Sequence, residues 1–215
     1  MKFRLREMRR PHSEALNLCE IYLKKLGGAW FCIGLMADGI LRFTSLSERD
    51  AKEALSRGIR FLKAWEKPRK AESIPREAEK IFRQMAEAYQ GLGVRELPPL
   101  AWSELKPFTR KVLRLTLQIP RGCVTSYRLM AKVLGVPRAA RAVGVALASN
   151  PYPLLIPCHR IVKGDLTLGG YGLGVKIKAE ILRREGVSLE EAGKAVKVKP
   201  ECYLSWERLK RQQSV

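Results

Sequence analysis

The chain has little of several features that mark common classes of protein. Its longest apolar run, AWFCIGLMA at 29–37, is too short to cross a bilayer, and no apolar segment of a signal peptide follows the basic start MKFRLREMRR. The five cysteines form no CxxC pair, so the sequence indicates neither a zinc site nor a disulfide framework. No cofactor motif is recognisable. We therefore expect an intracellular protein with reduced thiols, no metal and no cofactor.

Acidic residues are also scarce. Lys and Arg number 41 against 21 Asp and Glu, a formal net charge of +20, which favours a polyanionic partner, nucleic acid before an anionic membrane surface. The excess is concentrated in 101–186, which has 15 basic and 4 acidic residues. Phosphate contacts are therefore expected in that segment. The chain has only two asparagines, a composition typical of proteins from hot environments.

Histidine is equally scarce, and one of the two histidines follows a cysteine directly. The run LLIPCHRIV, 154–162, is apolar on both sides and predicts a short buried strand interrupted by Pro157. Cys158 is then either a plain core residue, with its polar neighbour on the opposite face, or a nucleophile with His159 as its base. This run alone leaves both interpretations open.

The sequence predicts an α+β protein, beginning with a small α/β domain at 1–95 that contains a β-hairpin. The hairpin turns at Asp38-Gly39, and Ser47 caps the helix after it, with Asp50 at the capping-box position. A Gly- and Pro-rich stretch at 91–102 predicts the domain boundary. The predicted elements are helices at 13–26, 47–66 and 76–90, and strands at 29–36 and 40–46.

A second domain, 101–187, is predicted to be mostly helical. Phe108 lies in a first helix that stops before Pro120, Ser126 caps a second helix at 127–135, and Pro137 starts a third at 137–150. The pattern is that of a helix-turn-helix whose last helix would read DNA. The small residues on that helix would allow it either to enter a DNA groove or to pack closely against other helices. The positive charge of this segment favours the DNA groove. Residues 188–215 form an extension of unknown role.

Three ordered blocks carry a resemblance to a known family. They are FTRKVLRLTLQIPRGCVTSYRLMA at 108–131, ARAVGVALASNPYPLLIPCHRIV at 140–162 and GGYGLGVKIKAEILRREG at 169–186. Together they resemble the C-terminal domain of the O6-alkylguanine-DNA alkyltransferases. The resemblance implies a methylated-DNA–protein-cysteine methyltransferase that repairs double-stranded DNA by transferring the alkyl group of O6-alkylguanine irreversibly to its own Cys158. The first domain resembles the family loosely, and the tail has no match.

The resemblance also implies roles for individual residues. Cys158 is the nucleophile, His159 takes its proton through a water, Asn150 orients the imidazole and Glu185 accepts a hydrogen bond from it. Tyr127 and the backbone amide of Gly172 donate to the leaving guanine, and the carbonyl groups of Cys158 and Ile161 read its amino group. Leu147, Pro153 and Tyr171 form the pocket walls. Without the resemblance, Glu185 reads as a surface carboxylate and Asn150 as a turn residue.

A base must leave the duplex before a protein thiol can reach it. The resemblance implies that Arg141 fills the vacated place while its helix lies in the minor groove, and that Tyr127 crowds the adjacent phosphate. Many relatives have serine where this chain has Gly172, so a side-chain hydroxyl is missing there. Arg160 is predicted to be structural. The other DNA contacts are expected at Thr125, Ser126, Arg128, Arg138, Ala148 and Ser149.

Three other functions compete with alkyl transfer: a non-catalytic binder of DNA lesions, a cysteine hydrolase and a transcription factor with a redox cysteine. The cysteine at position 158 argues against the first, and the adjacent Cys-His pair beside a helix-turn-helix argues against the second. The chain is expected to act as a monomer in the cytoplasm, associated with the nucleoid in a prokaryote, or in the nucleus of a eukaryote.

Overall fold

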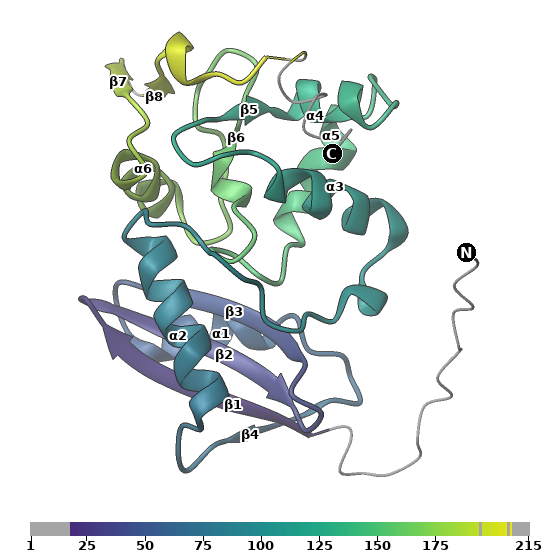
Figure 1. Ribbon diagram of the computed structural model, residues 1–215, viewed down its shortest axis with the longest axis vertical. Coiled ribbons are helices and arrows are strands. Elements are labelled where there is room, and N and C mark those ends of the chain that lie inside the picture. The colour runs from purple at the N-terminus through teal and green to yellow at the C-terminus, as the bar shows by residue number, and fades with distance from the viewer. Residues whose placement is uncertain (1–17, 194, 206, 208–215) are drawn as a thin grey trace.

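The computed structural model describes residues 18–193, 195–205 and 207, which form an N-terminal sheet part and a C-terminal helical part (Figure 1). The sheet has the strand order β3-β2-β1-β4, with β4 parallel to β1 and the other pairs antiparallel. Helices α1 and α2 cover its opposite faces, so this part is a three-layer sandwich. Its elements are β1 (Leu18–Leu26), β2 (Ala29–Met36), β3 (Leu41–Ser47), α1 (Ala51–Ile59), β4 (Lys67–Lys70) and α2 (Arg76–Tyr89).

The predicted hairpin and the helix at 76–90 are confirmed, whereas the helix predicted at 13–26 is wrong. Residues 18–26 of that segment form β1, and 13–17 lie outside the described residues. Cys19, Ile21 and Leu23 pack towards α1 while Tyr22 faces the other core, the alternation of a strand. The apolar spacing fits both structures, and pairing with strands on both sides favours the strand.

The helix predicted at 47–66 is shorter and begins later. Ser47 ends β3, and Asp50 is the N-cap, its side chain accepting a hydrogen bond from the Glu53 amide at 2.7 Å. The helix ends at Ile59. The following turn is held by Glu66, which accepts from the Lys63 amide at 2.7 Å and pairs with buried Arg42 at 2.8 Å. This tertiary ion pair could not be read from the local pattern.

The helical part contains the three predicted helices in order. Ser126 caps α4 by accepting from the Leu129 amide at 3.1 Å, as predicted. The third helix begins at Ala140 instead of Pro137, because Ala139 donates to Val136 in a turn before it. Helices α4 and α5 pack together, and a helix-turn-helix function for them remains a prediction. The elements are α3 (Pro107–Leu117), β5 (Thr125–Ser126), α4 (Tyr127–Val133), α5 (Ala140–Ala148), β6 (Ile161–Val162) and α6 (Val175–Arg184).

The two parts share one continuous apolar core. Thr44 on β3 donates its amide to Pro151 and its hydroxyl to Pro153, both at 2.8 Å, and the Ala101 amide donates to the Tyr152 hydroxyl at 3.0 Å. The sheet therefore supports the segment that leads into PCHR. The division into domains at 1–95, 101–187 and 188–215 stays a prediction. In the described ranges, no helix has the length and apolarity needed to span a membrane.

The described residues of the C-terminal extension, 188–193 and 195–205, fold back onto the helical part. Strands β7 (Leu189–Ala192) and β8 (Ala195–Val198) form a hairpin, followed by the short 3-10 helix η4 (Pro200–Cys202). Val198 and Cys202 pack in a second apolar cluster with Val124 and Leu182. The Tyr203 hydroxyl lies 2.8 Å from the Ser126 hydroxyl. The extension is thus bonded to the residue that caps α4.

Replacing Tyr203 with phenylalanine should lower the free energy of unfolding by about 0.5–1.5 kcal/mol, the usual net value of one intramolecular hydrogen bond. The ring would still pack, so only the bond to Ser126 is lost. Urea unfolding of both proteins measures the difference. An unchanged midpoint at an unchanged slope would show that this bond contributes nothing to stability.

Candidate active site

The segment PCHR forms a 3-10 turn, η3 (Cys158–Arg160), and the predicted strand is confined to the two residues of β6 after it. A turn forms here in place of a strand because of local hydrogen bonds. The Cys158 amide donates to the Ile156 carbonyl and the Arg160 amide donates to the Pro157 carbonyl, which closes the turn. Residues 151–162 are all buried. A turn points three successive side chains in different directions, so thiol, imidazole and guanidinium each meet different neighbours.

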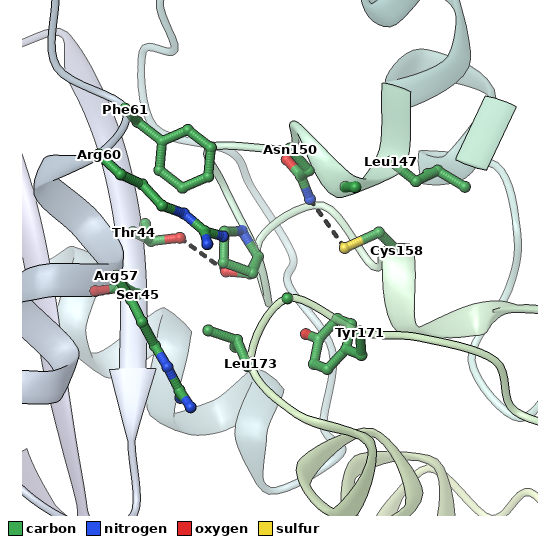
Figure 2. A pocket seen from close by; sticks show the side chains of 13 residues that line it. Thr44, Ser45, Arg57, Arg60, Phe61, Leu147, Asn150, Cys158, Tyr171 and Leu173 are labelled. Atoms are coloured by element: carbon green, nitrogen blue, oxygen red, sulfur yellow. Dashed lines mark hydrogen bonds between the residues drawn. The ribbon is translucent and has the colours of Figure 1, made fainter. Parts of the chain in front are cut away.

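Cys158 is 8% exposed, and its thiol contacts Asn150 (Figure 2). The Asn150 side-chain amide donates to Cys158 Sγ at 3.1 Å and to the Ile156 carbonyl at 3.3 Å, while its oxygen accepts from the Tyr152 amide at 2.9 Å. Asn150 therefore contacts the thiol, and the role of orienting the imidazole is not supported. Burial raises the pKa of Cys158, and the hydrogen bond from Asn150 partly offsets this by favouring the thiolate.

His159 lies in a buried cluster with Glu185 and Arg160. Its Nε2 is 3.1 Å from Glu185 Oε1, the contact predicted for this pair. Arg160 donates to the same carboxylate at 2.9 and 2.6 Å and to the Ile119 carbonyl at 2.6 Å, a structural role as predicted. Burial lowers the pKa of His159, which keeps the imidazole neutral and able to accept a proton. No described residue bonds to its buried Nδ1, the atom left for a proton relay.

The carboxylate of Glu185 should make stability depend on pH. Burial alone raises its pKa, but hydrogen bonds from His159 and Arg160 outweigh this and lower it from 4.5 to about 2. Because the pKa of Glu185 is lower in the folded chain than in the unfolded chain, the ionised carboxylate stabilises the fold at pH values above the unfolded-state pKa. This stabilisation is lost as the pH falls through the folded-state pKa. The free energy of unfolding of the native chain should therefore fall by ~3 kcal/mol between about pH 5 and 2 through this group. In Glu185→Gln this contribution to the pH dependence should be absent.

Urea unfolding of the two proteins at several pH values measures this loss. The difference between their free energies of unfolding should shrink as the pH falls. Other carboxylates titrate in both proteins and cancel in the comparison. A difference that stays constant over the whole range would contradict a lowered pKa at Glu185.

Lys178 is a site neighbour that the sequence interpretation missed. Its side chain is fully buried on α6, and its Nζ donates to the carbonyls of Ile161 and Leu168, both at 2.5 Å. Burial lowers its pKa to about 8. The two hydrogen bonds of Lys178 join β6, the strand after η3, to the loop that leads to Tyr171. Its spacing of seven residues from Glu185, two turns along one helix face, is the signal that could have found it.

A pocket of about 350 Å³ opens in front of the thiol. Tyr127, Leu147, Tyr171 and Gly172 line it, so the structure brings these predicted residues together around Cys158. Burial raises the pKa of both tyrosines, which keeps their hydroxyls protonated as donors. The rings of Tyr171 and His159 form an edge-to-face pair, with centroids 6.3 Å apart.

A smaller recess continues from the pocket towards the sheet part, and Pro153 lines it as predicted. The sequence interpretation missed its other wall, which comes from the N-terminal part of the chain (Figure 2). Nothing in the local sequence signals these residues, because only the docking of the two parts brings them to the thiol. They are Thr44, Ser45, Arg57, Arg60 and Phe61.

The predicted DNA contacts divide into exposed and buried side chains. Thr125 and Ser126 are buried, and the Ser126 hydroxyl is taken up by its cap and by Tyr203, so their side chains do not reach the surface. On α5, Val143, Ala146 and Leu147 pack inward. The exposed candidates are Arg128, Arg138, Arg141, Ala148 and Ser149.

The site has the chemistry of a cysteine-nucleophile protein: a buried thiol next to an imidazole–carboxylate pair, with basic side chains exposed on helices close by. Within the described ranges, no cluster of His, Cys, Asp or Glu could hold a metal ion. Residues 107–187 match the family described as 6-O-methylguanine DNA methyltransferase, DNA binding domain. This C-terminal region of the chain is similar to that family.

Two curated relatives illustrate the match. The methylated-DNA–protein-cysteine methyltransferase of Pyrobaculum aerophilum is 51% identical over 76 residues, which is 35% of this chain and 50% of the relative. The human protein of the same name is 45% identical over 87 residues, 40% of this chain and 42% of the relative. The matches thus span half or less of these relatives.

The likeness to solved structures covers more of the chain. The O6-methylguanine-DNA methyltransferase of Pyrococcus kodakaraensis has a TM-score of 0.56 at 27% identity, covering 79% of this chain and 99% of that one. The OGT protein of Mycobacterium tuberculosis, solved in complex with DNA, has a TM-score of 0.57 at 25% identity, covering 78% and 92%. The sheet part therefore contributes to the shared fold.

Proposed function

We propose that this chain is a direct-reversal DNA repair protein that transfers the alkyl group of O6-alkylguanine in duplex DNA to Cys158. One observation carries the proposal: inside the family-matched region, the thiol opens into a pocket lined by Tyr127, Tyr171 and Gly172 and lies next to the buried His159–Glu185 pair. The DNA complex of the M. tuberculosis neighbour supports DNA as the partner.

The mechanism follows from the roles of the thiol and its base. His159 takes the thiol proton through a water, Asn150 stabilises the thiolate, and the sulfur attacks the alkyl carbon. The carbon–oxygen bond breaks with its electron pair left on guanine O6, where donors from Tyr127 and the Gly172 amide stabilise the charge. The guanine then takes up a proton. The product thioether is not labile, so each molecule acts once.

Binding would use the exposed basic residues of α4 and α5. Arg128, Arg138 and Arg141 contact the DNA, with Arg141 in the place of the extruded base. Ala148 and Ser149 lie exposed at the end of α5, where their surface can contact the DNA backbone. Thr125 and Ser126 would act through the backbone or by supporting α4.

The test is incubation with duplex DNA that contains O6-methylguanine labelled on its methyl group. The label should move to the protein in a one-to-one ratio, and Cys158→Ala should abolish the transfer. Cys123→Ala, at a partly exposed thiol away from the pocket, is the matched control and should react normally. Label that stays on the DNA, or release of label as a small molecule over many turnovers, would refute the proposal.

A further inference from the structure

Arg60, at the C-terminal end of α1, reaches the active-site pocket from the N-terminal part of the chain (Figure 2). It lines both the outer pocket and the inner recess, together with Cys158, Tyr171 and Gly172. Arg60 therefore lies where the two spaces meet. A residue in the sheet part, outside the family-matched region, thus contributes to the space in front of the thiol.

Both the backbone and the side chain of Arg60 are held in place by neighbouring residues. Its amide bonds to the Gly58 carbonyl at the end of α1, and the turn after it is anchored by the buried Arg42–Glu66 pair. Its guanidinium lies over the Phe61 ring, 4.8 Å from the ring centroid. Such stacking orients the plane of the guanidinium without using its N–H donors.

Those donors have no acceptor within the described part of the chain: Arg60 makes no hydrogen bond or ion pair there. Arg57, one turn earlier and also at the recess, differs because it donates to Glu53 and to the Leu46 carbonyl. An oriented cation with free donors at the edge of a pocket is suited to bind a group that carries or develops negative charge.

The contact with Gly172 indicates which part of a substrate Arg60 would meet. A Cβ atom on Gly172 would lie 3.3 Å from Arg60 Nη2, closer than ordinary van der Waals contact. The guanidinium therefore packs against the loop whose Gly172 amide faces the leaving oxygen in the proposed function. The absence of a side chain at 172 leaves room for it.

We infer that Arg60 is a substrate-binding residue that donates a hydrogen bond to O6 of the extruded guanine as the alkyl group leaves. This inference rests on the proposed function. The thiolate sulfur forms a bond to the alkyl carbon, the carbon–oxygen bond breaks, and its electron pair stays on O6. Arg60 donates a hydrogen bond and transfers no proton. The proton of the thiol remains on His159, and the guanine anion is protonated after release.

The experiment measures methyl transfer from two substrates: duplex DNA with O6-methylguanine, and the free base O6-methylguanine, which has no phosphate. Arg60→Met should slow transfer from both by about 10- to 100-fold, the effect of losing one hydrogen bond to a charged group. Arg60→Lys should recover part of the rate. Lys52→Met, which removes an exposed charge from the same helix, should match the native chain.

Gly172→Ala tests the contact from the other side. The backbone at 172 accepts alanine without strain, but the new Cβ displaces the guanidinium. Gly172→Ala should slow transfer, and the double variant with Arg60→Met should be no slower than Arg60→Met alone, because both changes remove one interaction.

The possible failures are distinguishable. A native chain that takes no label from either substrate overturns the proposed function and this inference with it. A native chain that is active, with Arg60→Met slowed only on DNA, shows a phosphate contact and overturns the inference alone. Unchanged or faster transfer in Arg60→Met also overturns the inference alone. The same holds if the effects of Arg60→Met and Gly172→Ala on the rate are fully additive in the double variant.

Discussion

Replacing Glu185 with alanine is expected to lower the free energy of unfolding by about 3–5 kcal/mol, the usual result of removing one partner from a buried ion pair. The Arg160 guanidinium, whose side chain is 9% exposed in the native structure, would lose its carboxylate. The His159 imidazole would lose its only side-chain hydrogen-bond partner among the described residues. The positive charge of Arg160 would therefore stay largely buried without a paired carboxylate.

Chemical denaturation of the two proteins at neutral pH tests this expectation. Glu185→Gln is the matched variant, since it keeps the shape and one acceptor oxygen and should lose less stability than alanine. Glu180→Ala, on the same helix and paired with Arg184 in a more exposed position, should change stability by less than about 1 kcal/mol. A loss of similar size in Glu180→Ala and Glu185→Ala would show that burial of the pair is not the cause.

Replacing His159 with glutamine is expected to slow alkyl transfer by about 10²–10⁴-fold at neutral pH, the usual contribution of a general base. Burial raises the pKa of Cys158, so the thiol rarely ionises without a base. The variant should regain rate steadily as the pH rises, because hydroxide can then remove the proton. The native rate should depend less on pH above neutrality.

Single-turnover transfer of label from duplex DNA over a range of pH measures both effects. Unfolding of the variant, followed by circular dichroism, separates loss of the base from loss of the fold. Binding to unmodified duplex DNA should be unchanged, since His159 is 1% exposed and cannot reach a phosphate. Equal rates in the native and variant chains at neutral pH would remove His159 from the mechanism.

Local signals in the sequence were sufficient for several elements. The Asp38-Gly39 turn predicted the hairpin, and Ser126 predicted the start of α4, because each depends on neighbours within a few residues. Helix α1 and strand β1 were predicted less well. The turn that follows α1 depends on Arg42, on a different strand, and β1 depends on pairing with β2 and β4.

By itself the sequence predicted the nucleophile and its two partners, since the resemblance carried by the PCHR run and its ordered neighbouring blocks points to Cys158, His159 and Glu185. Only the tertiary structure decided what surrounds them: Asn150 on the thiol, Arg160 sharing Glu185, and Arg60 at the pocket. The physical reason is the separation in sequence between the residues involved. Motifs record chemistry along the chain, whereas contacts between residues far apart, such as Arg60 and Gly172, exist only once burial of a common core has brought the two parts together.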